Sequence, residues 1–424
     1  MTIKRLRIAL FLFALLIRVA YTLLKLRSNG LERGYDAGDY IQFAEFMQVQ
    51  GWMVEDISAL NLHAGPGYPW VLFLDMSLSG GNSFYLSIAL NVVVSALFCV
   101  LLFHLLLNLG LNRNISLGAG LWASLYVQHL RYVPELNKET LVIFLLAFVI
   151  YTLYQRPEMI KFRMLALGAL AYSYLIHIDE RYFFYIPFLV VFMLLPPLKS
   201  GVRNAMLFSF LVILSMIPWL YRNYIVFERP VILTERTAPF TDKLLGYESP
   251  ANPYRQDPIS PYQRTNIPVY EAFTDSLIQG YELKSKGYRY LDLMKEGIQN
   301  ADTPYTQGKW EAKWSEFKEM YKPVHFQGAY TANGYRYQRP WKAASNLIYG
   351  LQYGGLLLLL PFGIVQLSRT HRRLLYLILM VIVVHTLIHV FIAYGLQRYR
   401  VPIDFCLMIL GAFGVQFIIK KATN

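Results

Sequence analysis

The chain carries two carboxylates, Asp36 and Asp39, in the stretch GYDAGDYIQFAEFM (34–47), which follows a long apolar segment. In a helix, residues three and four apart share a face, so Asp36, Asp39 and Tyr40 would lie together near its start. A carboxylate can act as a general base toward a hydroxyl group, and sugars stack on aromatic side chains such as Tyr40. A single aspartate at this place can equally cap the next helix, and the sequence leaves both interpretations open.

Basic and acidic side chains recur at the ends of other apolar segments. The stretches are PELNKET (134–140), HIDERY (177–182), IPWLYRNYIVF (217–227) and LQRYRVPI (396–403). They contain the cations Lys138, Arg181, Arg222, Arg398 and Arg400 and the anions Glu139, Asp179 and Glu180. A guanidinium group has a planar donor fork that matches phosphate oxygens, so an anionic lipid headgroup is a suitable ligand. Ion pairs that only stabilise helix ends are the alternative for any one pair.

The elements that must position these residues are apolar segments of membrane-spanning length. The 424 residues are 55% hydrophobic and 16% charged, and the apolar residues occur in runs. This composition is typical of a polytopic, all-α membrane protein. Ten stretches could span a membrane: 8–26, 84–108, 115–130, 140–154, 164–178, 182–196, 205–221, 343–364, 374–394 and 403–419. The net charge of +13 comes from short clusters between these runs, which indicates topology rather than nucleic-acid binding.

Alternate connections carry the basic clusters, so those connections and both termini are predicted to be cytoplasmic. We expect the first apolar run to be an uncleaved helix, because no small-residue cleavage site follows its basic start. The predicted organisation is a transmembrane core (1–221) with a first outward loop (27–83), a long outward loop (222–342) and C-terminal transmembrane helices (343–424). Within the first loop, GYPWVLFLDMSLSG (67–80) is too short to span and predicts a helix along the outer interface.

The cysteine and histidine patterns predict no cofactor. Cys99 and Cys406 both lie in apolar runs, so neither a disulfide framework nor a cysteine-based metal site is indicated. His385 and His389 are four residues apart on one helix face, but the sequence offers no evident third ligand, which favours a buried hydrogen-bonded pair. A divalent cation at the acidic first loop is compatible with the sequence and is not indicated by it.

Five segments resemble, in the same order, motifs of GT-C glycosyltransferases related to the protein O-mannosyltransferases (glycosyltransferase family 39) and to the bacterial aminoarabinose transferases of lipid A. The segments are DAGDYIQFAEFM, GPGYPWVLF, KETLVIFLL, IPWLYRNYIVF and QRYRVPIDFCLMILGAFG. They resemble the first-loop acidic signature, the Pro-Gly-Tyr-Pro segment, the Glu that opens the fourth span, the Pro-Trp-x-x-Arg-Asn-Tyr segment and the Arg-Tyr-Arg-x-Pro opening of a late span. Ala37 follows Asp36 where the family commonly has Glu, and the long outward loop matches poorly.

The resemblance implies a GT-C-type bundle of about ten transmembrane helices. It also implies an inverting hexosyl- or pentosyltransferase that moves a sugar from a polyprenyl-phosphate carrier to a hydroxyl of a lipid, glycan or protein acceptor, at the outer face of the membrane. The uncleaved first helix and the basic cytoplasmic connections favour a bacterial inner membrane. Asp36 would be the general base, with Asp39 as its substitute or partner. The other implied substrate-binding residues are Tyr40, Lys138, Glu139, Arg181, Arg222, Arg398 and Arg400. Of these, the three arginines 222, 398 and 400 are the candidates for the carrier phosphate, which needs cations rather than a protonating acid.

Two other classes of membrane protein fit parts of the pattern. An O-antigen-type polymerase also combines many spans with a large outward loop, and its chemistry would depend on arginines of that loop. A transporter or flippase of lipid-linked sugars would carry ionisable or helix-breaking residues near mid-membrane in corresponding halves of the chain. The sequence shows no such symmetry, so this class fits less well than the glycosyltransferase.

Overall fold

The computed structural model describes residues 2–29, 31, 36–51, 65–81, 83–154, 162–195, 201–227, 231, 313–314, 317–318, 320–321, 330–331, 334–335, 340–392 and 397–423. These residues are almost entirely helical. The described strands are two short pieces, β1 (Tyr330–Thr331) and β2 (Gly334–Tyr335), which pair antiparallel. Helices predominate because a backbone surrounded by lipid has to satisfy its hydrogen bonds within each segment.

Six of the described helices are long and apolar enough to cross a membrane. They are α1 (Ile3–Asn29), α4 (Tyr85–Asn108), α10 (Gly201–Phe227), α16 (Pro340–Thr370), α17 (Arg372–Leu387) and α19 (Asp404–Thr423), the last two counted with short helical pieces next to them. Two shorter apolar helices are α7 (Glu139–Leu153) and α8 (Phe162–Ile178). The fold is therefore that of an integral membrane protein, while the expected count of about ten spans is not confirmed.

Two of the ten expected spans are divided in the structure. The segment 115–130 breaks at Tyr126, whose backbone is extended, into α5 (Arg113–Leu125) and α6 (Val127–Tyr132). The segment 182–196 consists of a 3-10 helix, η1 (Glu180–Tyr185), and the nine-residue α9 (Ile186–Leu194). Hydropathy measures the length of an apolar run and does not detect a change of backbone conformation inside it.

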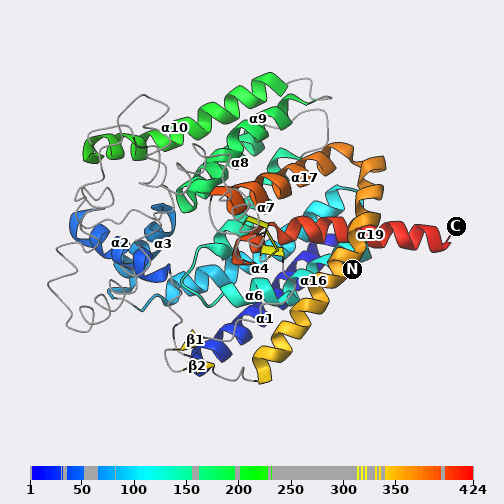
Figure 1. Cartoon of the computed structure of the whole chain (residues 1–424), viewed down its shortest axis with the longest axis horizontal. Coiled ribbons are helices and arrows are strands. Elements are labelled where there is room, and N and C mark those ends of the chain that lie inside the picture. Colours follow the sequence, from blue (N-terminus) through cyan, green and yellow to red (C-terminus); the bar gives the residue numbers. More distant parts are fainter. Residues whose placement is uncertain are drawn as a thin grey trace, which may run out of the picture.

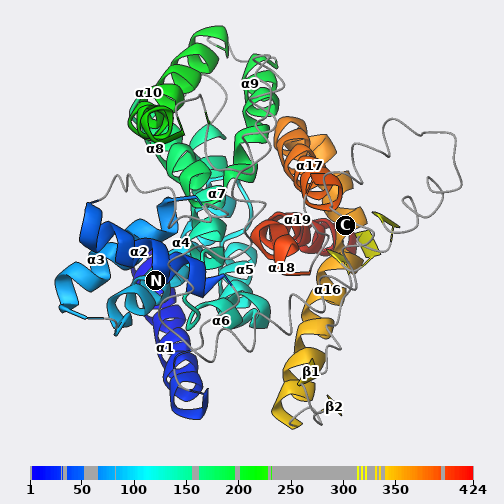
Figure 2. The ribbon, with the colours of Figure 1, turned by 60° about the vertical axis from the view of Figure 1, so that its left-hand side comes forward.

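The helices pack around α4, which contacts α1, α5 and α7. α7 packs on α8, α8 on α10, and α19 on α16. Figure 1 shows the two termini toward one end of the molecule, and α2 (Ala37–Gln50) and α3 (Gly67–Ser79) at the opposite end. In both Figure 1 and Figure 2, α8, α9 and α10 stand together on one side, while α1 and α16 extend on the other.

The segment predicted to be the first outward loop contains the helix that the sequence predicts over residues 67–80, here α3. α3 packs against α2, and Gln48 of α2 donates a hydrogen bond to Oγ of Ser77 at 2.6 Å. Asp75 is buried and its Oδ2 accepts a hydrogen bond of 2.6 Å from the backbone N–H of Ser87, in the first turn of α4. A carboxylate stabilises the positive end of a helix dipole, so Asp75 fastens this loop to the central helix.

α1 carries a charged residue, Arg18, that is fully buried inside the bundle. Its guanidinium donates to Oγ of Ser95 at 2.7 Å and to Sγ of Cys99 at 3.1 Å, both on α4. It also donates to backbone carbonyl oxygens of Ala14, Ala123 and Ser124. Five neutral acceptors from three helices therefore surround one cation, as is usual for an arginine inside an apolar span.

The predicted long outward loop, 222–342, lies mostly outside the described residues. α10 continues to Phe227, beyond the expected end of the core at residue 221, and α16 begins at Pro340. Cys99 and Cys406 are buried and form no disulfide, in agreement with their positions in apolar runs.

Candidate active site

Asp36 occupies the N-cap position of α2, yet its side chain makes no capping hydrogen bond. Its Oδ2 instead lies 3.2 Å from Nη1 of Arg398, which belongs to α18 (Gln397–Arg400) near the other end of the chain. The two side chains are 33% and 26% exposed, respectively. The helix-cap interpretation of Asp36 therefore does not account for its carboxylate, which pairs with a cation from a distant segment.

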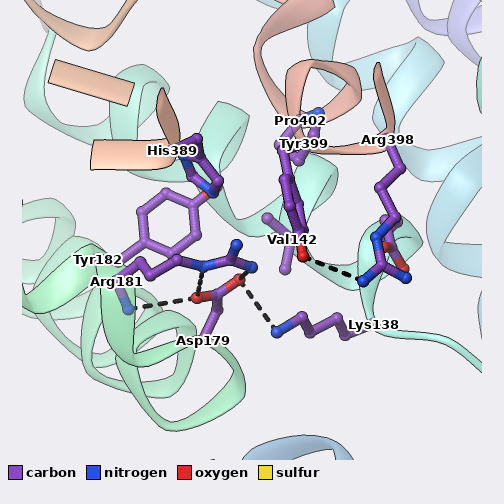
Figure 3. A pocket seen from close by; sticks show the side chains of 10 residues that line it. Lys138, Val142, Asp179, Arg181, Tyr182, His389, Arg398, Tyr399 and Pro402 are labelled. Carbon is purple, nitrogen blue, oxygen red and sulfur yellow. Dashed lines mark hydrogen bonds and ion pairs between the residues drawn. The ribbon is translucent and has the colours of Figure 1, made fainter. Parts of the chain in front are cut away.

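Arg398 lines a small pocket whose empty volume is about 240 Å³, including space open to the surroundings. The lining residues are Lys138, Glu139, Val142, Asp179, Arg181, Tyr182, His389, Arg398, Tyr399 and Pro402. They come from the start of α7, the corner between α8 and η1, a π-helical turn after α17 (Ile388–Ile392, η3), and α18 with the following 3-10 turn (Val401–Ile403, η4). Figure 3 shows these charged side chains converging from different segments.

Asp179 holds two of the cations at the base of the pocket. Nε of Arg181 donates to Oδ1 at 2.7 Å and Nη2 donates to Oδ2, while Nζ of Lys138 lies 3.1 Å from Oδ2. Burial alone would raise the pKa of the Asp179 carboxyl, but Arg181 and then Lys138 outweigh it and hold that pKa well below its usual value. Burial likewise opposes the charge on Arg181, and Asp179 more than compensates, so the pKa of Arg181 is raised. This cluster is a fixed ion network.

Glu139, the first residue of α7, is 4% exposed and lines the same pocket. No described residue donates a hydrogen bond to its Oε2. A buried acceptor without a donor carries a desolvation cost of about 1–3 kcal/mol. Glu139 is therefore suited to accept a hydrogen bond from a bound molecule.

The corner that carries Asp179 is positioned by close backbone contact with the start of α3. A Cβ on Gly67 would lie 2.6 Å from the backbone nitrogen of Ile178, so only glycine permits this approach. The hydroxyl of Tyr174 donates to the carbonyl oxygen of Gly67 at 3.0 Å. The Arg181 guanidinium, on the same corner as Asp179, lies 4.4 Å from the centre of the Tyr399 ring. The predicted GPGYPW segment thus positions the site indirectly, by packing against the end of α8 that leads to Asp179.

Arg400 and Arg222, both predicted to bind phosphate, do not line the pocket. Arg400 is fully buried, with Nε donating to Oδ1 of Asp404 at 3.0 Å and its guanidinium 3.8 Å from the centre of the Tyr353 ring. Arg222, in the last turns of α10, lies over the ring of Trp219 at 4.9 Å. Both guanidinium groups are engaged by protein groups, so Arg398 is the predicted phosphate ligand that reaches the pocket.

Tyr40 and Asp39, the other two residues predicted to act in the first loop, differ in their exposure. Tyr40 is 1% exposed, and its ring meets Tyr68 edge to face at 5.2 Å, so its face is covered by protein instead of forming an open wall for a sugar. Asp39 is exposed on α2. The pattern placed Asp36, Asp39 and Tyr40 on one side of a helix, but packing against α3 separates a buried ring from an exposed carboxylate.

His385 and His389 form the hydrogen-bonded pair expected from their spacing. Their rings lie 4.0 Å apart between centroids. Nδ1 of His385 accepts a hydrogen bond from the hydroxyl of Tyr185 at 2.6 Å, and its Nε2 contacts the carbonyl oxygen of Tyr399. In the part of the chain that the structure describes, no group of three His, Cys, Asp or Glu side chains is placed to hold a metal ion.

The arrangement offers three cations and three carboxylates within one region. Lys138 and Arg181 are held by Asp179, whereas Arg398 pairs with Asp36 where both are partly exposed. An entering anion can therefore exchange with Asp36 on Arg398 without breaking the buried network. A carboxylate released in this way is close to the bound anion and free to accept a proton.

Comparison with known proteins gives a fold and no sequence family. No protein-family model matches the chain, and no curated protein sequence matches it. A solved structure, the archaeal oligosaccharyltransferase AglB from Archaeoglobus fulgidus in complex with an inhibitory peptide and a dolichol-phosphate, is similar with a TM-score of 0.57 at 11% sequence identity. The two chains share a fold. The similarity covers 99% of this chain and 51% of the other, so this chain spans about half the length of that protein.

Proposed function

We propose that the protein is an integral membrane glycosyltransferase that transfers a sugar from a polyprenyl-phosphate carrier to an acceptor hydroxyl. The observation that carries the proposal is the ion pair between Asp36 and Arg398. The Asp36 carboxylate makes no helix-capping hydrogen bond and instead pairs with a cation that lines the pocket. The similarity in fold to an oligosaccharyltransferase, whose structure contains a dolichol-phosphate, supports a GT-C-type enzyme with a lipid-phosphate donor.

In the proposed reaction, Arg398 binds the carrier phosphate and Asp36 accepts the proton of the acceptor hydroxyl. The hydroxyl oxygen forms a bond to the anomeric carbon as the bond from that carbon to the phosphate oxygen breaks, and the electron pair leaves with the phosphate. Attack opposite the leaving group inverts the anomeric configuration. Cations arranged in advance stabilise the charge that develops on the phosphate, and no protonating acid is needed.

The finer features of the proposal come from the sequence. We assign to the protein about ten spans on the basis of its apolar runs, and cytoplasmic termini on the basis of the basic connections between them. We assign its site to the outer face of a bacterial inner membrane, on the basis of the family resemblance and these connections. The sugar is a hexose or pentose, and the acceptor is a lipid, a glycan or a protein. The proposed mechanism assigns no role to a metal ion.

The test is turnover of a panel of radiolabelled polyprenyl-phosphate sugars by purified protein in nanodiscs, with membrane extract as the acceptor source. Asp36→Asn should lower turnover by about 10²- to 10⁴-fold, the usual contribution of a general base. Glu45→Gln is the matched control, because it makes the same isosteric change at an exposed carboxylate of the same helix. Normal turnover by Asp36→Asn would falsify the assignment and favour a polymerase that depends on arginines of the long loop.

A further inference from the structure

His389 is a pocket residue to which the proposed reaction gives no role. It is 2% exposed and lines the pocket beside Arg181 and Tyr399. Its ring lies tilted against the Tyr399 ring, with 5.1 Å between the two centroids. It lies on the π-helical turn Ile388–Ile392, where α17 departs from regular geometry. Single π-helical turns within α-helices occur frequently at functional sites. Figure 3 shows its ring above Arg181, on the wall away from Lys138.

The hydrogen bonds of the ring determine what it can offer. Nδ1 of His389 lies 2.8 Å from the carbonyl oxygen of His385, and a carbonyl oxygen only accepts, so Nδ1 carries a proton. In the neutral ring, Nε2 then has a lone pair. Among the described residues, the hydrogen bond of this ring is the one that Nδ1 donates to His385, and none reaches Nε2. His385 differs, because both of its ring nitrogens are used within the protein, by Tyr185 and by the carbonyl of Tyr399.

An acceptor nitrogen in this pocket cannot serve the phosphate, which itself only accepts hydrogen bonds from cations and N–H groups. Its natural partner is a hydroxyl group. We propose that Nε2 of His389 accepts a hydrogen bond from a substrate hydroxyl, and that His389 is therefore a substrate-binding residue of the site. The hydroxyl belongs either to the transferred sugar or to the acceptor. This inference rests on the proposed function, because that function brings both hydroxyl-bearing groups to the pocket.

Three substitutions separate hydrogen bonding from packing. His389→Gln can place an amide oxygen where Nε2 stands, whereas His389→Asn can replace only the Nδ1 donor to the His385 carbonyl. His389→Leu fills similar volume without either polar atom. His104→Gln is the control, because it makes the same change at the far end of α4, where His104 contacts Arg7. Wild-type turnover is measured first with the donor that the panel identifies, and Asp36→Asn confirms that the reaction is the proposed one.

We expect His389→Asn and His389→Leu to lower kcat/KM about tenfold, which is the effect of one lost hydrogen bond to a buried group. We expect His389→Gln to keep most of the wild-type kcat/KM. If the hydroxyl belongs to the sugar, His389→Asn weakens binding of the sugar-loaded carrier and not of polyprenyl phosphate alone. If it belongs to the acceptor, both lipids bind normally and KM for the acceptor rises. Equal losses in the Gln, Asn and Leu variants, or no loss in any, would overturn the inference while leaving the Asp36 result intact. Absence of wild-type turnover would reject the proposed function and this inference with it.

Discussion

Replacing Asp179 by Asn tests whether the ion network at the base of the pocket stabilises the fold. The carboxylate accepts two hydrogen bonds from the Arg181 guanidinium and one from the Arg181 backbone N–H, lies 3.1 Å from Nζ of Lys138 and is 3% exposed. The amide keeps the volume but leaves two mostly buried cations, each 12% exposed, without their anion. Breaking a buried pair in this way costs about 3–5 kcal/mol, so Asp179→Asn should lower the free energy of unfolding by about that amount.

The difference in free energy of unfolding between the wild type and Asp179→Asn should decrease at acidic pH and should not increase. The pKa of Asp179 in the folded protein lies well below its value in the unfolded chain, because Arg181 and Lys138 outweigh the effect of burial. A carboxyl with a lowered folded-state pKa stabilises the fold above the unfolded pKa of about 3.9, and this stabilisation is lost as the pH falls through the folded-state pKa. The difference between wild type and variant should therefore stay constant from about pH 5 to pH 8 and narrow below about pH 4.

The assay is equilibrium unfolding in mixed detergent micelles with increasing SDS, repeated across this pH range. Glu45→Gln serves as the control, because an exposed carboxylate of α2 should change the free energy of unfolding by less than about 0.5 kcal/mol. The reasoning is refuted if Asp179→Asn is as stable as the control, or if the difference grows on acidification.

Arg398→Gln should weaken binding of polyprenyl phosphate at least about tenfold with little change in stability, because its ion pair is partly exposed. Arg400→Gln should instead lower the free energy of unfolding by about 3–5 kcal/mol, because the buried Asp404 loses its cation. Lipid binding and SDS unfolding are measured for both variants. Equal changes in lipid affinity and in stability for the two variants would contradict these different roles of Arg398 and Arg400. Gly67→Ala should destabilise by about 1–3 kcal/mol through its clash with the Ile178 backbone, whereas Gly81→Ala, with open space around it, should have almost no effect in the same unfolding measurement.

Much of the site was accessible from charge placement along the sequence. Lys138, Arg181 and Arg398 stood out because each lies at the end of an apolar run, in a connection predicted to face outward, where cations are disfavoured. The structure brings all three to one pocket. Glu139 stood beside Lys138 and lines the same pocket. The sequence could predict this convergence because helix ends on one side of a membrane share a plane.

We did not predict from the sequence that Arg398 lines the pocket while Arg400 is buried and paired with Asp404, although the sequence contains a signal for this difference. On a helix, residues two apart point about 200° from each other, so only one of the two arginines of QRYR can face a given pocket. The buried state of Tyr40 and the central position of Asp179 could not be read in the same way. Both depend on which helix packs against which, and periodicity within one segment does not carry that information. The break at Tyr126 was hidden for a related reason, since an apolar run reads the same whether or not its backbone bends.

The buried guanidinium of Arg18 has a consequence for how the protein is built during synthesis. A lone arginine at the centre of an inserting helix opposes entry into the bilayer by about 2.5–3.5 kcal/mol. Its side-chain acceptor Ser95 is 77 residues later in the chain, and the carbonyl of Ser124 is 106 residues later. α1 thus leaves the ribosome well before α4 and α5 exist, and until then only the carbonyl oxygen of Ala14, on α1 itself, accepts a hydrogen bond from the Arg18 guanidinium. Nascent α1 should therefore stay beside the insertion machinery, or be held by a chaperone there, until the third of these helices has been translated.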